Sequence, residues 1–189
     1  MIPRWLRRIA TGRAVAISLL IWLSYSAIIL NWGPYPRLKR SIIELPEEDF
    51  TATASESQSK LVQLGERGRE RYREFLRLEI ANALITTVAS TLLMTYALSR
   101  LVDSKSPAGL LVYLPIVAGI CDLIENAQLA AAIKHYPHAS LPALRVASIA
   151  TRLALYLGGI VLPVLAFCYA KLGHRAWRAR RKMGEAHRS

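Results

Sequence analysis

Residues Gly109–Ile133 read GLLVYLPIVAGICDLIENAQLAAAI, an apolar segment in which Asp122 and Glu125 are the only charged side chains. The segment exceeds the roughly 20 apolar residues that a helix needs to cross the hydrocarbon core of a bilayer. A charged side chain at that depth costs about 2.5–3.5 kcal/mol on insertion scales, so such residues face a partner, a water-filled cavity or a substrate. This stretch therefore predicts both a membrane span and a candidate site.

Three further segments have the same character, in a chain with 53% hydrophobic residues and a mean hydropathy of +0.26. Residues 14–32 and 80–99 contain no charged side chain, and residues 146–170 contain Arg152 alone. Each segment is long enough to cross a bilayer as a helix. We therefore predict an all-α fold, a four-transmembrane-helix bundle. Its expected spans are at about residues 14–32, 80–101, 109–133 and 144–171.

The remaining sequence divides around this membrane domain, which we assign to residues 14–175. Residues 1–13 form a basic N-terminal segment, residues 33–79 an extramembrane segment, and residues 176–189 a basic C-terminal tail. The basic start followed by a long apolar run resembles a secretory signal, but no small-residue cleavage motif follows it. We expect a retained signal anchor.

An amphipathic helix is predicted to lead into the second span, because no proline interrupts the sequence from Lys60 to Ser99. Acid–base pairs recur at i,i+3 spacing: Glu66–Arg69, Glu70–Arg73 and Glu74–Arg77. The apolar face consists of Leu61, Leu64, Tyr72, Phe75 and Leu76. That face either lies on the bilayer surface, packs on the bundle, or belongs to a solvated lead-in.

The net charge of +12 is concentrated beside the spans. Basic residues at the two termini are expected to set the topology and to contact anionic lipid headgroups. No motif for reading bases accompanies them, so no nucleic-acid partner is expected. The acid-free N-terminus predicts a protein of the bacterial inner membrane with both termini on the cytoplasmic side. It also fits an organellar import signal, which leaves the mitochondrial inner membrane as the alternative.

The sequence predicts neither a disulfide nor a metal centre. Cys121 and Cys168 lie at depths that differ by more than about 10 Å on antiparallel helices, whereas a disulfide needs Cα atoms within about 7 Å. His135 and His138 bracket Pro137 without a third ligand nearby in the sequence. We expect two free thiols, no metal and no cofactor.

Polar residues at helical spacing predict that the four spans carry polar side chains at a similar depth in the membrane, which we call the polar level. Glu125 and Arg152 are at similar depth on sequential antiparallel helices, within reach of an ion pair. Asp122 and Asn126 share the helical face of Glu125. The other stripes contain Tyr25 on the first span, Asn82 and Thr86 on the second, and Tyr156 with Arg152 on the fourth. Four inward-facing stripes would form one cavity in the outer half of the bilayer.

Two interpretations of this level are open. The Glu125–Arg152 pair acts as a staple that fixes helix register, or the level is a functional site. A staple explains Asp122 poorly, because one arginine neutralises one acid and the second carboxylate is in surplus. A surplus buried carboxylate suits proton exchange or cation binding.

The segment Ala118–Asn126 and the Gly-Arg-Glu-Arg-Tyr-rich sequence before the second span resemble a family of uncharacterised bacterial four-span membrane proteins. Those proteins carry an Asp-x-x-Glu-Asn motif on the third helix, and the likeness covers about Gly65–Pro137. The resemblance implies the same topology and a role for Asp122, Glu125 and Asn126. It implies no particular activity.

Three classes of function fit these features. The first is an accessory or assembly protein whose polar core fixes helix register. The second is a binding protein or an isomerase-like enzyme for a small lipophilic molecule, in which Asp122 and Glu125 donate and accept a proton and Arg152 orients the substrate. The third is a proton- or cation-coupled carrier that works as an oligomer. A protein partner or a homo-oligomer is compatible with these classes.

The topology predicts that residues 55 and 189 lie on opposite sides of the membrane. In a background without Cys121 and Cys168, cysteines introduced at Ser55 and Ser189 should react with an impermeant thiol reagent from opposite faces of sealed vesicles. Permeabilised vesicles provide the control in which both positions react. Reaction of both positions from one face would contradict the four-span topology.

Overall fold

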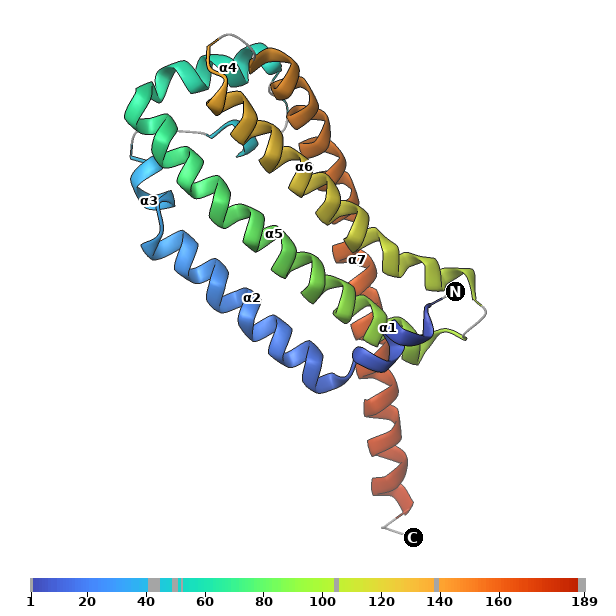
Figure 1. Ribbon diagram of the computed structural model, residues 1–189. Coiled ribbons are helices and arrows are strands. Elements are labelled where there is room, and N and C mark those ends of the chain that lie inside the picture. The colour runs from blue at the N-terminus through green and yellow to red at the C-terminus, as the bar shows by residue number, and fades with distance from the viewer. Residues whose placement is uncertain are drawn as a thin grey trace.

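The computed structural model describes residues 2–40, 45–48, 51, 53–103, 106–137 and 140–186, and its fold is all-α (Figure 1). Its helices are α1 (Arg4–Ile9), α2 (Gly12–Trp32), α3 (Tyr35–Leu38), α4 (Ala54–Gln63), α5 (Gly65–Leu101), α6 (Leu114–Lys134) and α7 (Ser140–Ala186), with short 3-10 helices η1 (Pro46–Glu48) and η2 (Pro107–Tyr113). Four stretches are long and apolar enough to cross a membrane: Gly12–Leu38, Gly65–Leu101, Pro107–Lys134 and Leu141–Ala179. This confirms the predicted fold class and describes a multi-pass membrane protein.

Local sequence signals explain where the helices begin and end. Thr11 caps α2, since its hydroxyl accepts a hydrogen bond from the Ala14 N–H at 3.2 Å, and the Gly33-Pro34 pair ends that helix. Ser106 caps η2 in the same way through the Ala108 N–H at 3.3 Å. The third span therefore begins as a 3-10 helix and becomes α-helical at Leu114.

The amphipathic lead-in packs on the bundle, but it is not one continuous helix. Thr53 and Glu56 form a capping box that starts α4, and the chain breaks between α4 and α5 at Gly65, whose φ is +63°. Glycine adopts this left-handed conformation without the penalty that a Cβ would bring. The predicted helix from Lys60 to Ser99 is therefore wrong at this position. Its apolar face is buried, with Leu61 and Tyr72 fully enclosed.

Of the three predicted i,i+3 ion pairs in this segment, the described residues contain Glu70–Arg73, at 3.9 Å. Arg69 instead donates to the Leu61 carbonyl at 3.0 Å across the α4–α5 break. Its guanidinium lies 4.1 Å from the centre of the Tyr136 ring. Arg69 thus joins the start of α5 to the turn between α6 and α7.

The spans pack in the order α2, α5, α6, α7, and α7 also contacts α5 (Figure 1). The contact between α6 and α7 is the most extensive, as expected for two helices joined by a short turn. Among the described residues, α2 packs on α5 without a comparable contact to α7. The bundle is therefore open along the side between α2 and α7.

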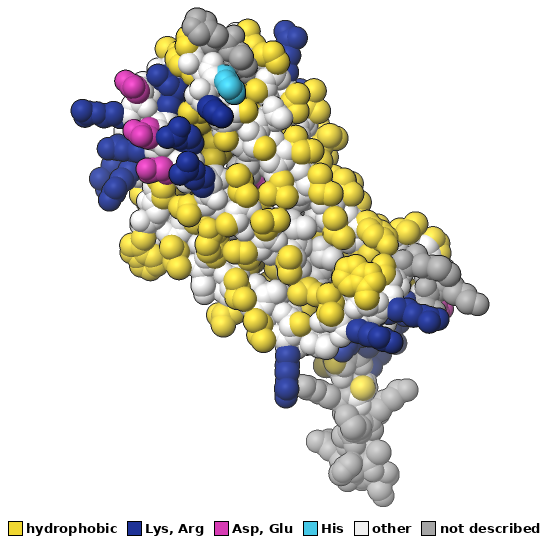
Figure 2. Space-filling model, in the orientation of Figure 1, with side chains coloured by type: hydrophobic (Ala, Val, Ile, Leu, Met, Phe, Trp, Pro, Cys, Tyr) yellow, Lys and Arg dark blue, Asp and Glu magenta, His cyan; other side chains and the backbone are white. Residues whose placement is uncertain are grey.

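The buried apolar core is divided between the two ends of the bundle. One cluster includes Leu38, Leu61, Tyr72 and Leu144, at the end that carries α3 and α4. A second includes Leu6, Met94, Val112 and Cys168, at the end where α1 packs on α5, and a small third cluster consists of Ala10, Val15 and Leu92. Hydrophobic side chains cover the middle of the molecule, and charged side chains gather toward its ends (Figure 2). That exposed apolar surface suits contact with lipid.

Helix α1 and the C-terminal part of α7 lie at the same end of the bundle, and α7 extends beyond the other helices there (Figure 1). The Arg175 guanidinium donates to the Arg100 carbonyl at 3.1 Å, where α7 passes the end of α5. Cys121 and Cys168 are both buried free thiols, as predicted.

The close contact between α5 and α6 depends on Gly119. A Cβ at this position would lie 1.8 Å from the Thr87 hydroxyl oxygen, a clash that requires the helices or the threonine to move. We expect Gly119→Ala to destabilise the protein by about 1–3 kcal/mol, the usual cost of overpacking. Thermal unfolding of purified protein in detergent measures this loss, and Thr87→Ala in the same chain should recover part of it.

Gly158 supplies the matched control, because a Cβ there meets nothing within 4 Å. Gly158→Ala should leave the unfolding temperature unchanged or slightly raised, since alanine favours a helix more than glycine does. Equal effects of the two substitutions would show that α5 and α6 are not in close contact at Gly119.

Candidate functional site

Helix α6 supplies the central polar residues, because Asp122, Glu125 and Asn126 fall on one face at i, i+3 and i+4. Glu125 and Asn126 are buried, at 6% and 5% exposure, and Asp122 is half-buried. The Asn126 amide donates to the Asp122 backbone carbonyl and to its carboxylate, both at 3.0 Å. This hydrogen bonding within one helix holds the Asp122 carboxylate in place.

A second acidic residue, Glu79 on α5, lines the same cavity as Asp122. Glu79 is half-buried and accepts a hydrogen bond from the Asn82 amide at 3.3 Å. Glu79 is absent from the predicted polar stripes, because it is the last residue of the predicted extramembrane segment 33–79. The available signal was helical spacing, since Glu79 continues the buried face of Tyr72 and Phe75 toward Asn82.

The acidic residues line a cavity of about 540 Å³, which we call the acidic cavity. Its polar wall consists of Glu48, Glu79, Asp122, Glu125, Asn126 and Thr151. The side chains of Tyr35, Phe75 and Leu162 complete much of the remaining surface. Carboxylates from α5, α6 and the segment before α4 thus converge on one space.

A second cavity of about 330 Å³, the apolar cavity, adjoins the first. Residues from all four spans line it, including Trp22 on α2, Leu93 on α5, Pro115 on α6 and Leu165 on α7. The two cavities share Asp122, Ala154, Gly158 and Leu162 as wall residues. Asp122 therefore lies where an apolar space meets an acidic one.

The predicted residues of the first and second spans fasten α2 to α5. The Tyr25 hydroxyl donates to the Leu78 carbonyl at 3.3 Å, and the Ser26 hydroxyl donates to the Asn82 side-chain oxygen at 3.1 Å. Asn82 thereby links α2 to Glu79. Thr86 lies in the wall of the apolar cavity.

The predicted residues of the fourth span lie elsewhere. Arg152 is exposed, donates to the Thr51 carbonyl at 3.3 Å, and does not line the acidic cavity. Tyr156 is 70% exposed. Helix α7 instead turns Thr151, Ala154 and Gly158 toward the acidic cavity. Successive side chains of a helix are rotated by about 100° from one another. The predicted stripe of Arg152 and Tyr156 is therefore on a different face of α7 from the residues that line the cavity.

Glu48 enters the acidic cavity from the segment between α3 and α4. Its carboxylate accepts hydrogen bonds from the Tyr35 hydroxyl at 2.8 Å, the Lys39 ammonium at 2.6 Å and the Leu45 N–H at 2.9 Å. Burial by itself raises the pKa of Glu48, but these hydrogen bonds and the Lys39 charge outweigh it, so the pKa lies below its ordinary value. Lys39 therefore supplies Glu48 with a matched cation.

Glu79 and Asp122 have a different environment. Within the described part of the chain, Glu79 and Asp122 each accept from an asparagine amide and form no ion pair. Across those same residues, no group of three His, Cys, Asp or Glu side chains is placed to hold a metal ion, and His138 lies outside them. Two neighbouring carboxylates without a cation favour a shared proton or a bound cationic group.

Comparison of the chain with protein-family models, with curated proteins and with solved structures found no match. The resemblance to four-span proteins with an Asp-x-x-Glu-Asn motif stays a prediction.

The lowered pKa of Glu48 predicts an acid-dependent stability. A carboxyl group whose pKa falls on folding stabilises the protein fully at pH values above its ordinary pKa of 4.5. This stabilisation is lost as the pH falls through the lowered pKa of the folded state. We expect Glu48→Gln to cost about 1–3 kcal/mol at neutral pH, the usual worth of a hydrogen-bonded charged group. Unfolding temperatures at stepped pH should show the two proteins converging in acid.

Glu74→Gln is the matched control, because Glu74 is exposed and makes no hydrogen bond or ion pair within the described residues. Its unfolding curve should follow that of the wild type at every pH. A gap between wild type and Glu48→Gln that stays constant down to acid pH would disprove the role of the Glu48 charge.

Proposed function

We propose that the protein binds a small amphiphilic molecule that enters from the bilayer. The apolar cavity holds the apolar body of this molecule, and the acidic cavity holds a head that carries a positive charge or donates hydrogen bonds. The observation that supports the proposal is the shared wall at Asp122, where the two cavities meet. Such a meeting matches a ligand with one apolar end and one polar end.

The chemistry of the acidic wall defines the head of the ligand. Asp122 and Glu79 present carboxylate oxygens, which accept hydrogen bonds and attract cations. Because neither has a cationic partner among the described residues, a protonated amine would supply the missing charge. This environment disfavours a ligand with a carboxylate or phosphate head, because like charges repel.

The helix arrangement supports entry from the side. Helices α2 and α7 both line the apolar cavity, yet they lack the extensive contact that joins the other neighbouring spans. A lipophilic molecule dissolved in the bilayer could pass between them without crossing the polar ends of the bundle. The exposed apolar side chains along both helices, such as Leu20 and Leu162, suit this lipid-facing position.

The other classes of function stay predictions. We propose a bacterial inner membrane with both termini in the cytoplasm. The arginines of α1 and of the end of α7 support this orientation, because basic flanking segments favour the cytoplasmic side.

The ligand chemistry can be tested with dodecylamine and dodecanol, which share a chain length and differ in charge. A ligand at about a hundred times its Kd adds about 2.7 kcal/mol of stability, which raises Tm by roughly 5–10 °C for a chain of this size. We expect this rise with dodecylamine and a smaller one with dodecanol. Asp122→Asn should remove the difference between the two ligands, and Glu74→Gln should preserve it.

Filling the cavity tests the site separately from its charge. Gly158→Leu places a side chain in the shared wall, whereas Gly173→Leu adds the same side chain to the same helix outside both cavities. Gly158→Leu should abolish the dodecylamine shift, and Gly173→Leu should retain it. Retention of the shift in Gly158→Leu, or equal shifts by amine and alcohol in the wild type, would refute the proposal.

A further inference from the structure

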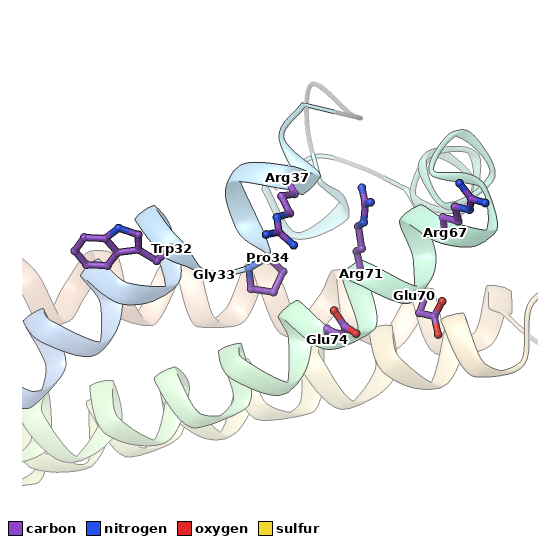
Figure 3. Close-up of a pocket in the computed structure, with 8 residues that line it drawn as sticks. All are labelled: Trp32, Gly33, Pro34, Arg37, Arg67, Glu70, Arg71 and Glu74. Carbon is purple, nitrogen blue, oxygen red and sulfur yellow. The ribbon is translucent and has the colours of Figure 1, made fainter.

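A separate cleft of about 540 Å³ lies between α3 and the first turns of α5 (Figure 3). It is lined by Trp32, Arg37, Arg67, Glu70, Arg71 and Glu74, and we call it the arginine cleft. Arg67 and Arg71 are one turn apart on α5, and Arg37 comes from α3. The cleft shares no wall residue with the acidic or the apolar cavity.

The cleft has an excess of unused positive charge. Arg37, Arg67 and Arg71 are exposed, and within the described part of the chain none of them forms a hydrogen bond through its side chain or an ion pair. Glu70 lies 3.9 Å from Arg73, which is outside the cleft. Three guanidinium groups therefore face two carboxylates, one of which already has another cation.

The position of the cleft matches the headgroup level of a bilayer. Trp32 is the last residue of the apolar helix α2 and is 79% exposed. Tryptophan at the end of a span concentrates at the boundary between hydrocarbon and headgroups. Charged side chains gather at this end of the molecule, beside the apolar surface (Figure 2). The arginine cleft is therefore placed where a lipid phosphate would lie.

We infer that the arginine cleft binds the phosphate of an anionic phospholipid such as phosphatidylglycerol. A guanidinium group offers paired N–H donors that match two phosphate oxygens. Arg37 approaches from α3, while Arg67 and Arg71 project from the same face of α5 (Figure 3). A phosphate between them would bridge two elements, and its acyl chains would extend along the exposed apolar surface of α2.

The experiment titrates the full-length protein in detergent with phosphatidylglycerol, phosphatidylcholine or glycerol phosphate, and native mass spectrometry counts the bound molecules. We expect phosphatidylglycerol to bind more tightly than phosphatidylcholine. Replacing Arg37, Arg67 and Arg71 by glutamine should weaken phosphatidylglycerol about a hundredfold, on the basis of about fivefold for each arginine near a lipid surface.

The matched control replaces Arg40, Arg77 and Arg145 by glutamine, which removes the same charge from the same end of the molecule but outside the cleft, and leaves the Glu70–Arg73 pair intact. This control should bind phosphatidylglycerol like the wild type. Arg71→Lys, which keeps the charge and loses the paired donors, should give a smaller loss and serves if the triple substitution impairs folding.

Three outcomes would overturn the inference. Equal weakening in the two triple variants would mean a general attraction to charge, and equal binding of the two phospholipids would mean that the headgroup charge is not recognised. Binding of glycerol phosphate as tightly as the lipid would make the cleft a site for a soluble phosphate. None of these outcomes bears on the amine site at Asp122, since the two sites share no residue.

Discussion

The contact between Asn126 and Asp122 makes the centre of this bundle possible. A carboxylate inside an apolar helix must be hydrogen-bonded or exposed to a polar space, and here the partner is one turn away on the same helix. Asn82 plays the corresponding part for Glu79 on α5 and also accepts a hydrogen bond from α2. In the middle of the protein, asparagine amides therefore donate hydrogen bonds to carboxylates. The apolar clusters that hold the helices together lie toward the two ends.

The fold could be predicted from the sequence because its apolar runs, as helices, are long enough to cross the hydrocarbon core of a bilayer. Long apolar runs with few or no charges predicted four spans, and four stretches of the structure are long and apolar enough to cross a membrane. The break at Gly65 could not be predicted, because neither side of it contains proline and the pattern of apolar residues continues through it. Only the left-handed backbone conformation of that residue separates the two helices.

The candidate site was predicted in part. Local spacing on α6 placed Asp122, Glu125 and Asn126 on one helical face, and all three line one cavity. Arg152 and Glu125 were predicted to lie together because they have similar depths in the membrane. Depth does not determine how α7 is rotated about its own axis, and this rotation decides which side chains face the cavity. That rotation follows from the packing of α7 on α6 and α4, and it turns glycine and alanine toward the cavity instead of the arginine. Glu79 was missed because a charge next to a span was assigned to the water-exposed side.

The hydrogen bond within α6 also bears on how the protein is made. As the chain is synthesised, α6 reaches the membrane before α7 exists, so a stabilising partner on α7 would come too late to lower the cost of insertion. The Asn126 amide is available as soon as that turn of helix forms, because it is four residues from Asp122. An acidic helix that carries its own hydrogen-bond donor can enter the bilayer during translation and leave the pairing with α7 for a later assembly step.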